Sequence, residues 1–302
     1  MMQQTGKDFC IFFISRIKCV IISCLLNLIF KNKAYKIYNK GMILMSIGIF
    51  DSGLGGLTVL KEVRKIFPNE EIFYFGDTAR VPYGEKTKEL IVRYSKEITD
   101  FLLTKNISVL VVACNTATAL ALEELKASYD IPVIGVIEAG VRSALSATKT
   151  NEIGVIGTKA TINSEKYKQE IYRKNKDIAV YQKACPLFVH VVEEGLLDGE
   201  IIESIIKHYL GDFDDKVDTL ILGCTHYPLL KKEIHKIYPD LNLIDPATET
   251  ALDLKKILTE NNTPENKKGH VKFYVSDGVQ NFRNIGSMFL GEEIEDIELI
   301  KL

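Results

Sequence analysis

The sequence lacks tryptophan, a surplus of charge of either sign, and any regular spacing of its six cysteines. Its 38 basic and 40 acidic residues are interspersed and leave a formal net charge of −2, which excludes the basic surface typical of nucleic-acid-binding proteins. The irregular cysteine spacing argues against a disulfide framework, and the lack of a CxxC pair or a Cys/His cluster argues against a metal site. A 302-residue chain of ordinary apolar and charged content is long enough for two globular domains.

The N-terminal segment lacks the features of a membrane span and of a signal peptide. Phe9–Phe30 is strongly apolar but carries Arg16 and Lys18, and its uninterrupted part is shorter than the roughly twenty residues that a span requires. No small-residue cleavage site follows it. We interpret residues 1–45 as a leader outside the fold, with Met45 as a candidate translation start. A membrane-tethering leader is the alternative.

A strand-like run, a cysteine and a helix-like run follow one another in the stretch around which the rest of the chain is organised. Val109–Val112 is apolar and predicts a buried strand, Thr116–Leu125 predicts a helix, and Cys114 lies at the turn between them. The same arrangement recurs at Cys224, which stands between the apolar run Leu220–Leu222 and a second helix-like segment. The repeat predicts two copies of one unit, each with a cysteine at the carboxyl end of a strand.

Both cysteines would lie where open α/β sheets bind their ligands, outside the carboxyl ends of the strands. The unpaired N–H groups of the following helix attract anions and favour thiolate, so we expect thiol pKa values below the free value of about 8.5. The alternative is that each cysteine is a small buried apolar residue. Polar residues follow both cysteines: Asn115, Thr116, Thr225 and His226. These neighbours favour two thiols that face one substrate.

Strand-like and helix-like runs alternate along the whole chain after Met45. Apolar runs such as Glu71–Phe75 and Asn151–Ile156 predict strands, whereas Leu57–Phe67 and a single helix that ends at Lys174 show helical periodicity. The alternation predicts an α/β fold of doubly wound parallel sheets with helices on both faces. We expect two such sheets, closely joined, with a cleft between them.

Two loops in the first half of the chain place polar side chains after predicted strands. Asp51 and Ser52 open the turn DSGLGG, which lacks the G-x-G-x-x-G spacing of dinucleotide-binding folds. Asp77, Arg80 and Tyr83 lie in the loop GDTARVPYG. Because loops on a rigid scaffold are where binding residues concentrate, both loops are candidate parts of a site.

Five motifs occur in order and together carry a resemblance to a known family. They are DSGLGG at 51–56, GDTARVPYG at 76–84, VACNTA at 112–117, PLFV at 186–189 and GCTHYP at 223–228. On these motifs, the chain from Met45 to Leu302 resembles the glutamate racemases of the aspartate/glutamate racemase superfamily. His190 stands where this family usually has proline, and residues 1–45 have no counterpart in it.

The resemblance implies two α/β domains of similar topology, related by a pseudo-two-fold axis, with the active site between them. By motif, residues 46–137 and 247–302 form the first domain, and the inserted segment 138–246 forms the second. The implied activity is cofactor-independent interconversion of L- and D-glutamate in the cytoplasm, which supplies D-glutamate for peptidoglycan synthesis. Glutamate is the expected small-molecule partner and a homodimer the expected assembly, with no nucleic acid and with membrane contact only through the leader.

The resemblance also assigns roles at the site. Cys114 would take the α-proton from D-glutamate and Cys224 from L-glutamate, each acting as the acid in the other direction. Glu193 and His226 would assist Cys224, and Asp51 would orient the first thiol. No pyridoxal lysine motif is present, so position and charge must lower the barrier. The implied substrate-binding residues are Asp51, Ser52, Tyr83, Gly84, Asn115, Thr116, Thr225 and His226, with Asp77 near them.

Two other functions stay open on the sequence alone. An aspartate racemase or a maleate isomerase-like enzyme would share the paired cysteines, but such relatives lack the DSGLGG opening and the PYG loop. A non-catalytic amino-acid-binding or regulatory protein could use the same fold, although the retention of both cysteines and their neighbours disfavours it. Assays with D-glutamate and D-aspartate distinguish a glutamate racemase from the first alternative. Deuterium exchange at the α-carbon distinguishes an enzyme from the second.

Overall fold

A computed structural model of the protein describes residues 46–213, 215–260 and 269–302. The expected leader, residues 1–45, and its candidate start at Met45 lie outside the described residues. Within the described ranges, no helix combines the length and the hydropathy that crossing a membrane requires.

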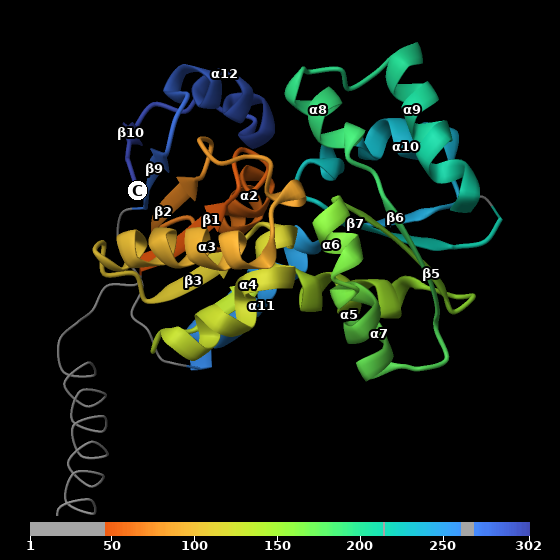
Figure 1. The fold of residues 1–302 in the computed structure, drawn as a ribbon, viewed down its shortest axis with the longest axis horizontal. Helices are drawn as coiled ribbons and strands as arrows, with labels where there is room; N and C mark the ends of the chain where they lie inside the picture. The colour runs from red at the N-terminus through yellow and green to blue at the C-terminus, as the bar shows by residue number, and fades with distance from the viewer. Residues whose placement is uncertain (1–45, 214, 261–268) are drawn as a thin grey trace, which may run out of the picture. The chain divides into compact units, whose positions relative to one another are not determined.

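The first sheet has six strands, all paired in parallel, in the order β10-β9-β2-β1-β3-β4 (Figure 1). Its strands are β1 (Ser46–Asp51), β2 (Glu71–Gly76), β3 (Val109–Val112), β4 (Val133–Gly135), β9 (His270–Val275) and β10 (Ile297–Leu299). The prediction of parallel strands is therefore confirmed for this half of the fold.

The second sheet has four parallel strands in the order β6-β5-β7-β8. These are β5 (Glu152–Gly157), β6 (Ala179–Ala184), β7 (Thr219–Gly223) and β8 (Asn242–Ile244). Counted within each half, the first four strands of both sheets stand in the same order, second-first-third-fourth. The repeat predicted from the two cysteine turns is thus present in the topology, because each cysteine follows the third strand of its sheet.

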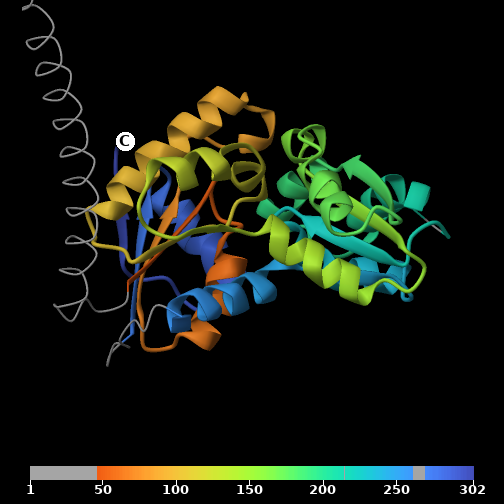
Figure 2. The same cartoon turned by 90° about the horizontal axis from the view of Figure 1, so that it is seen from below.

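Helices cover both faces of both sheets (Figures 1 and 2). Around the first sheet lie α2 (Leu57–Ile66), α3 (Lys88–Leu103), α4 (Asn115–Ser128), α11 (Pro246–Glu260) and α12 (Val279–Leu290). Around the second lie α5 (Ile137–Ala147), α6 (Lys159–Asn163), α7 (Lys166–Lys174), α8 (Leu187–Glu193), α9 (Glu200–Leu210) and α10 (Lys231–Ile237). Short 3₁₀ turns occur at η1 (Tyr83–Glu85), η2 (Gly211–Phe213) and η3 (Tyr227–Leu230).

The prediction of one helix ending at Lys174 was wrong. The segment forms two helices, α6 and α7, because Glu165 between them adopts a left-handed conformation with φ 53°. Thr158 caps the first of them, since its Oγ1 accepts a hydrogen bond from the backbone N–H of Thr161 at 3.2 Å. This cap places the start of α6 directly at the carboxyl end of β5.

The apolar runs of β1 and β3 explain why helices pack on both faces of the first sheet. Ile47 and Ile49 point into the core under α2 and α12, whereas Phe50, on the other face, packs in the core under α3 and α4. Val109 and Leu110 divide between the two cores in the same way. A strand buried on both faces needs this continuous apolar sequence. Each such side chain contributes about 1.5–3 kcal/mol by its burial, which stabilises the strands that carry the polar turns.

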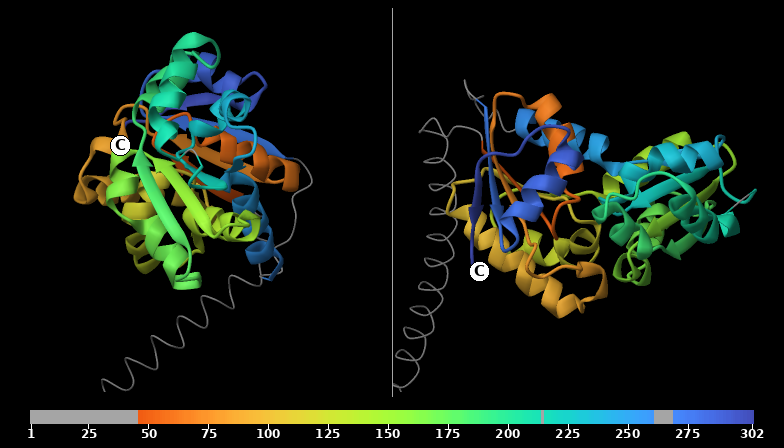
Figure 3. Two further views of the ribbon diagram at one scale, coloured as in Figure 1. Left: turned by 90° about the vertical axis from the view of Figure 1, so that its right-hand side faces the viewer. Right: turned by 90° about the horizontal axis from the view of Figure 1, so that it is seen from above.

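The chain crosses between the sheets twice, through helices that pack together. It leaves the first sheet from β4 into α5 and returns from β8 into α11, and these two helices contact each other (Figure 2; two further views in Figure 3). Arg142 of α5 forms an ion pair with Asp253 of α11. Both sheets belong to one compact unit, and one hydrophobic core contains residues of both, including Ile47 and Leu222.

Candidate active site

Polar and sulfur-bearing residues stand at the carboxyl ends of the central strands of both sheets. Asp51 is the last residue of β1, and Cys114 follows β3 after one alanine. In the second sheet, Thr158 follows β5 and Cys224 follows β7 directly. In each sheet these two strands are neighbours on either side of the point where the strand order reverses, which is where open α/β sheets place their ligands.

The two residues after Cys114 contact the second sheet's helices through their side chains. Oδ1 of Asn115 accepts a hydrogen bond from the hydroxyl of Tyr167 in α7 at 2.6 Å. Oγ1 of Thr116 lies 2.9 Å from Oγ1 of Thr158, the cap of α6. The start of α4 is therefore held against the other sheet by side-chain hydroxyls.

The DSGLGG turn contacts the turn that carries Cys224. The hydroxyl of Thr225 donates a hydrogen bond to Oδ1 of Asp51 at 3.3 Å. At Gly55 a Cβ atom would lie 2.2 Å from Oγ1 of Thr225 and 2.6 Å from Nδ1 of His226, so only glycine permits this approach. Residues 174 positions apart in the chain thus meet.

Cys114 is a buried thiol, only 4% exposed, with two sulfur contacts. Its Sγ donates to Oγ of Ser52 at 3.6 Å and accepts from the backbone N–H of Ala117 at 3.5 Å. Burial, reinforced by the negative charge of Asp51, raises the pKa of Cys114 to about 12. The expectation of a lowered thiol pKa was therefore wrong for this cysteine. The helix N–H does favour the thiolate, but loss of solvent and the neighbouring carboxylate outweigh it.

Asp51 is itself fully buried, and burial raises its pKa above the ordinary value. The positive charge of His226 and the hydrogen bond from the backbone N–H of Gly53, at 2.9 Å, act in the opposite direction. A carboxyl so placed can accept hydrogen bonds from an ammonium group, although it opposes ionisation of the Cys114 thiol.

Cys224 stands beside a histidine–glutamate pair. Nδ1 of His226 lies 3.8 Å from Sγ of Cys224, and Nε2 lies 2.9 Å from Oε1 of Glu193 at the end of α8. Burial alone would lower the pKa of His226, but its hydrogen bonds with Cys224 and Glu193 raise it to about 10. Burial likewise raises the pKa of Glu193, and the contact with His226 more than offsets this and lowers it. Near neutral pH the pair is imidazolium and carboxylate, and the imidazolium can stabilise negative charge on the sulfur.

The GDTARVPYG loop carries Tyr83 and Gly84 to the second sheet. The Tyr83 hydroxyl donates to Asp77 at 2.5 Å, and Asp77 also accepts from Arg80 at 2.7 Å and from Ser276 at 2.8 Å. Asp77 is fully buried, so the structure gives it the role of anchoring this loop. At Gly84 a Cβ would lie 2.6 Å from Cβ of Thr158, which brings the loop onto the start of α6.

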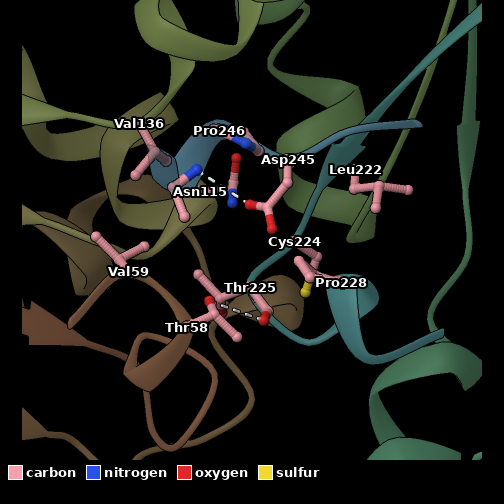
Figure 4. Close-up of a pocket in the computed structure, with 11 residues that line it drawn as sticks. Thr58, Val59, Asn115, Val136, Leu222, Cys224, Thr225, Pro228, Asp245 and Pro246 are labelled. Atoms are coloured by element: carbon pink, nitrogen blue, oxygen red, sulfur yellow. Dashed lines mark hydrogen bonds between the residues drawn. The ribbon is translucent and has the colours of Figure 1, made fainter. Parts of the chain in front are cut away.

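A small cavity lies among the turns from the two sheets (Figure 4). Its volume is about 10 Å³, close to the space that one water molecule needs. Asn115 at the start of α4, Cys224 and Thr225 are among its lining residues, together with Asp245 and Pro246 at the start of α11. In the described part of the chain, no group of three or more His, Cys, Asp or Glu side chains is arranged to hold a metal ion.

Three residues at this contact were not identified from the sequence: Thr158, Thr161 and Tyr167. Thr158 could have been found, because it follows the first strand of the second repeat as Asp51 ends the first strand of the first. Thr161 lies 3.2 Å from Thr116 through its Oγ1 and could have been found with it, one helical turn further on. No sequence pattern indicates Tyr167, because its helix, α7, comes close to the start of α4 only in the folded protein.

Comparison with known proteins places the chain among racemases. Residues 57–253 match the model of the family described as Asp/Glu/Hydantoin racemase. The chain belongs to this family. Within it, the chain is 54% identical over 261 residues to the glutamate racemase of Persephonella marina, which covers 85% of this chain and 99% of that relative. It is 53% identical over 251 residues to the glutamate racemase of Aquifex aeolicus, covering 83% and 96% respectively.

A solved structure agrees with these relatives. The glutamate racemase of Francisella tularensis in complex with D-glutamate is 43% identical, with a TM-score of 0.81 over 85% of this chain and 97% of that one. The resemblance to the glutamate racemases drawn from five motifs is thereby confirmed, as is the α/β fold with two parallel sheets.

Proposed function

We propose that this protein interconverts L- and D-glutamate by proton transfer between two thiols, Cys114 and Cys224, on opposite faces of the substrate's α-carbon. The activity is that of an amino-acid isomerase, as in the relatives described above. One observation carries the mechanism. Each thiol follows the third strand of a sheet with the same strand order, and the DSGLGG turn contacts both thiol-bearing turns, Cys114 through Ser52 and Thr225 through Asp51 and Gly55.

In the L-to-D direction, the Cys224 thiolate takes the α-proton and becomes a thiol. The electron pair of the broken C–H bond stays on the α-carbon, and the Cys114 thiol then gives its proton to the opposite face and becomes a thiolate. The D-to-L direction reverses both transfers. Two opposed groups are needed because a single base would have to move across the carbon between the two steps.

The resting protonation of the site fits the L-to-D direction. Because the pKa of Cys114 is about 12, this cysteine is a thiol near neutral pH and is ready to act as the acid. The imidazolium of His226, held by Glu193, lies against the sulfur that must act as the base. After one turnover the two thiols have exchanged their roles, so a proton must return from Cys224 to Cys114 before the next L-glutamate reacts.

Substrate binding is assigned to groups that line the contact between the sheets. The α-carboxylate would be held by the helix-start N–H groups and side chains of Asn115, Thr116, Thr225 and His226. Asp51 and Ser52 would hold the ammonium group, and Tyr83 and Gly84 would complete the wall. The cavity that Asn115, Cys224 and Thr225 help to line has a volume of only about 10 Å³, which supports a separation of the turns of the two sheets when glutamate enters.

The two sheets support a division into a first domain of residues 46–137 and 247–302 and a second domain of residues 138–246. We further propose that the enzyme works as a cytoplasmic homodimer and supplies D-glutamate for peptidoglycan synthesis. Sedimentation of the purified protein tests the dimer, and the loss of muropeptide precursors on depletion of the protein tests the pathway role.

Proton NMR of each glutamate enantiomer in deuterated water tests the central proposal. We expect the α-proton signal of both enantiomers to disappear, and optical rotation to decay to zero, with D-glutamate and not with D-aspartate. Exchange or racemisation of D-aspartate at a similar rate would assign the protein to the aspartate racemases. Glutamate binding without any exchange would assign it to the non-catalytic alternative.

A further inference from the structure

We propose that Tyr167 is a positioning residue for the reaction, which fixes the side-chain amide of Asn115 beside Cys114 with its N–H₂ group turned toward the substrate. The inference rests on the proposed function, because it takes Asn115 as a ligand of the substrate. It adds a residue from the second sheet to a binding group of the first.

The contact between these two side chains is direct. The Tyr167 hydroxyl donates to Oδ1 of Asn115 at 2.6 Å, and both side chains are buried, at 1% and 4% exposure. Burial, together with the nearby charges of Asp245 and Cys224, raises the pKa of Tyr167. The hydroxyl therefore keeps its proton and acts as a donor over the whole working pH range.

This hydrogen bond determines which end of the amide is free. Because Oδ1 is occupied by the tyrosine, Nδ2 is the end of Asn115 left for another group. No residue that the structure describes accepts a hydrogen bond from Nδ2. Asn115 lines the cavity together with Cys224, Thr225 and Asp245 (Figure 4). We infer that its donor end is turned to the substrate's carboxylate when glutamate is bound.

The ring of Tyr167 packs beside the other catalytic turn. A Cβ on Gly223, the residue before Cys224, would lie 3.0 Å from Cε2 of the ring. On the helix α5 side, a Cβ on Gly140 would lie 3.5 Å from Cε1. One side chain thus contacts the residue after Cys114 through its hydroxyl and the residue before Cys224 through its ring. This double contact keeps the hydroxyl in place to orient the amide.

Tyr167→Phe tests the role, because it removes the hydroxyl and keeps the ring. We expect KM for both glutamate enantiomers to rise about tenfold, as when one hydrogen bond to a charged group is lost, with kcat changed less than about twofold. The melting temperature should fall by only a few degrees. A purely structural role would lower the melting temperature and leave KM unchanged.

A double-mutant cycle with Asn115→Ala separates positioning from other effects. In the Asn115→Ala background, Tyr167→Phe should cause no further rise in KM, because the hydroxyl has nothing left to orient. The matched control is Tyr227→Phe, which removes another buried hydroxyl, bound at 2.9 Å to the backbone carbonyl of Cys185. Any effect of Tyr227→Phe should be the same with and without Asn115.

Two outcomes would overturn the inference while the proposed function stands. One is an unchanged KM in Tyr167→Phe, and the other is an equal rise in KM in both backgrounds. Failure of the proposed function looks different, since the unaltered protein would then show no exchange at the α-carbon of glutamate. If Asn115→Ala alone leaves KM unchanged, then Asn115 is no ligand and the positioning role falls with it.

Discussion

The two cysteine turns share a topology and differ in the charges that surround them. Cys114 caps α4, a regular helix of 14 residues, and has the carboxyl group of Asp51 as its charged neighbour. Cys224 precedes a short 3₁₀ turn and has the imidazole of His226 as its neighbour. Burial and the Asp51 carboxyl therefore keep the Cys114 thiol protonated, whereas an imidazole lies beside Sγ of Cys224.

The difference indicates how a repeated fold can perform an asymmetric task. The repeat supplies position, since strand order brings each thiol to the same place in its sheet. In the proposed mechanism, the chemistry depends on side chains that the two halves do not share: Asp51 and Ser52 near Cys114, and Glu193 and His226 near Cys224. In the proposed mechanism, Cys114 would serve as the acid and Cys224 as the base for L-glutamate.

Removing either thiol should have the largest effect. We expect Cys114→Ser and Cys224→Ser each to lower racemisation about a thousandfold, because each direction needs both an acid and a base. Circular dichroism should show an intact fold. Cys185→Ala is the matched control, since Cys185 is also a buried free cysteine of the second half, and it should retain activity. Near-normal turnover in either serine variant would contradict the two-thiol mechanism.

Adding a methyl group between the turns should have the next largest effect. In Gly55→Ala the new Cβ would meet Thr225 and His226, so the turns must move apart by a fraction of an ångström to about 1 Å. We expect kcat/KM to fall about a hundredfold, because misplacement of that size at reacting groups can cost this much. Gly211→Ala is the control, as a Cβ there meets nothing within 4 Å. Equal activity of the two variants would show that the close approach is irrelevant.

Glu193→Gln tests whether the histidine–glutamate pair distinguishes Cys224 from Cys114. Loss of the carboxylate removes one of the interactions that raise the pKa of His226 to about 10. We expect kcat to fall about tenfold and the alkaline limb of the pH–rate profile to move to lower pH, because the imidazolium then deprotonates earlier. Ser52→Ala, on the Cys114 side, should leave the position of that limb unchanged. A limb that stays in place in Glu193→Gln would exclude His226 as its origin.

Asp51→Asn should change the reactivity of the other thiol. The negative charge of Asp51 helps to raise the pKa of Cys114, so its removal should increase the thiolate fraction several-fold at pH 8. Peptide-resolved mass spectrometry of iodoacetamide labelling measures this change. Cys185 in the same sample is the internal control, because Asp51 is not among the groups that shift its pKa. Slower labelling of Cys114 in the variant would contradict the assignment.

The smallest effect concerns stability and pH. The pKa of His226 is about 10 in the folded protein and about 6.5 when unfolded, so its protonation stabilises the fold fully below pH 6.5. This contribution declines as the pH rises through about 10. We expect the unaltered protein to have a larger unfolding free energy than His226→Asn, by on the order of 1–3 kcal/mol at pH 6. This difference should shrink between pH 6 and pH 10. Urea unfolding of both proteins at several pH values measures this difference. A difference that does not change with pH would contradict the prediction.

The positions of both cysteines were predictable from the sequence. A strand-like run, a cysteine and a helix start make a local pattern, and parallel sheets bring the carboxyl ends of their strands to one edge. The partnership of His226 with Glu193 came only through the family resemblance, because 33 residues separate them and α8 has to fold first. Tyr167 had no signal at all, since its contact with Asn115 spans 52 residues and two sheets.

The protonation of Cys114 could not be predicted for a different physical reason. The helix start is visible in the sequence and argues for thiolate, whereas burial and the distance to Asp51 are properties of the packed structure. These two outweigh the helix and reverse the direction of the shift. The helix break at Glu165 was also not predictable, because a residue other than glycine in the left-handed conformation cannot be recognised from the sequence.

The pairing of α5 with α11 has a consequence for how this fold can be rebuilt. The segment that contains the second sheet is connected to the rest of the chain through α5 at one end and α11 at the other. Because these helices contact each other, the two connections lie close together in space. Such a segment can be transplanted as a cassette between related enzymes, provided that the Arg142–Asp253 junction travels with it. Chimeras cut within α5 and α11 would then exchange Cys224, Glu193 and His226 together and keep the recipient's own equivalent of Cys114.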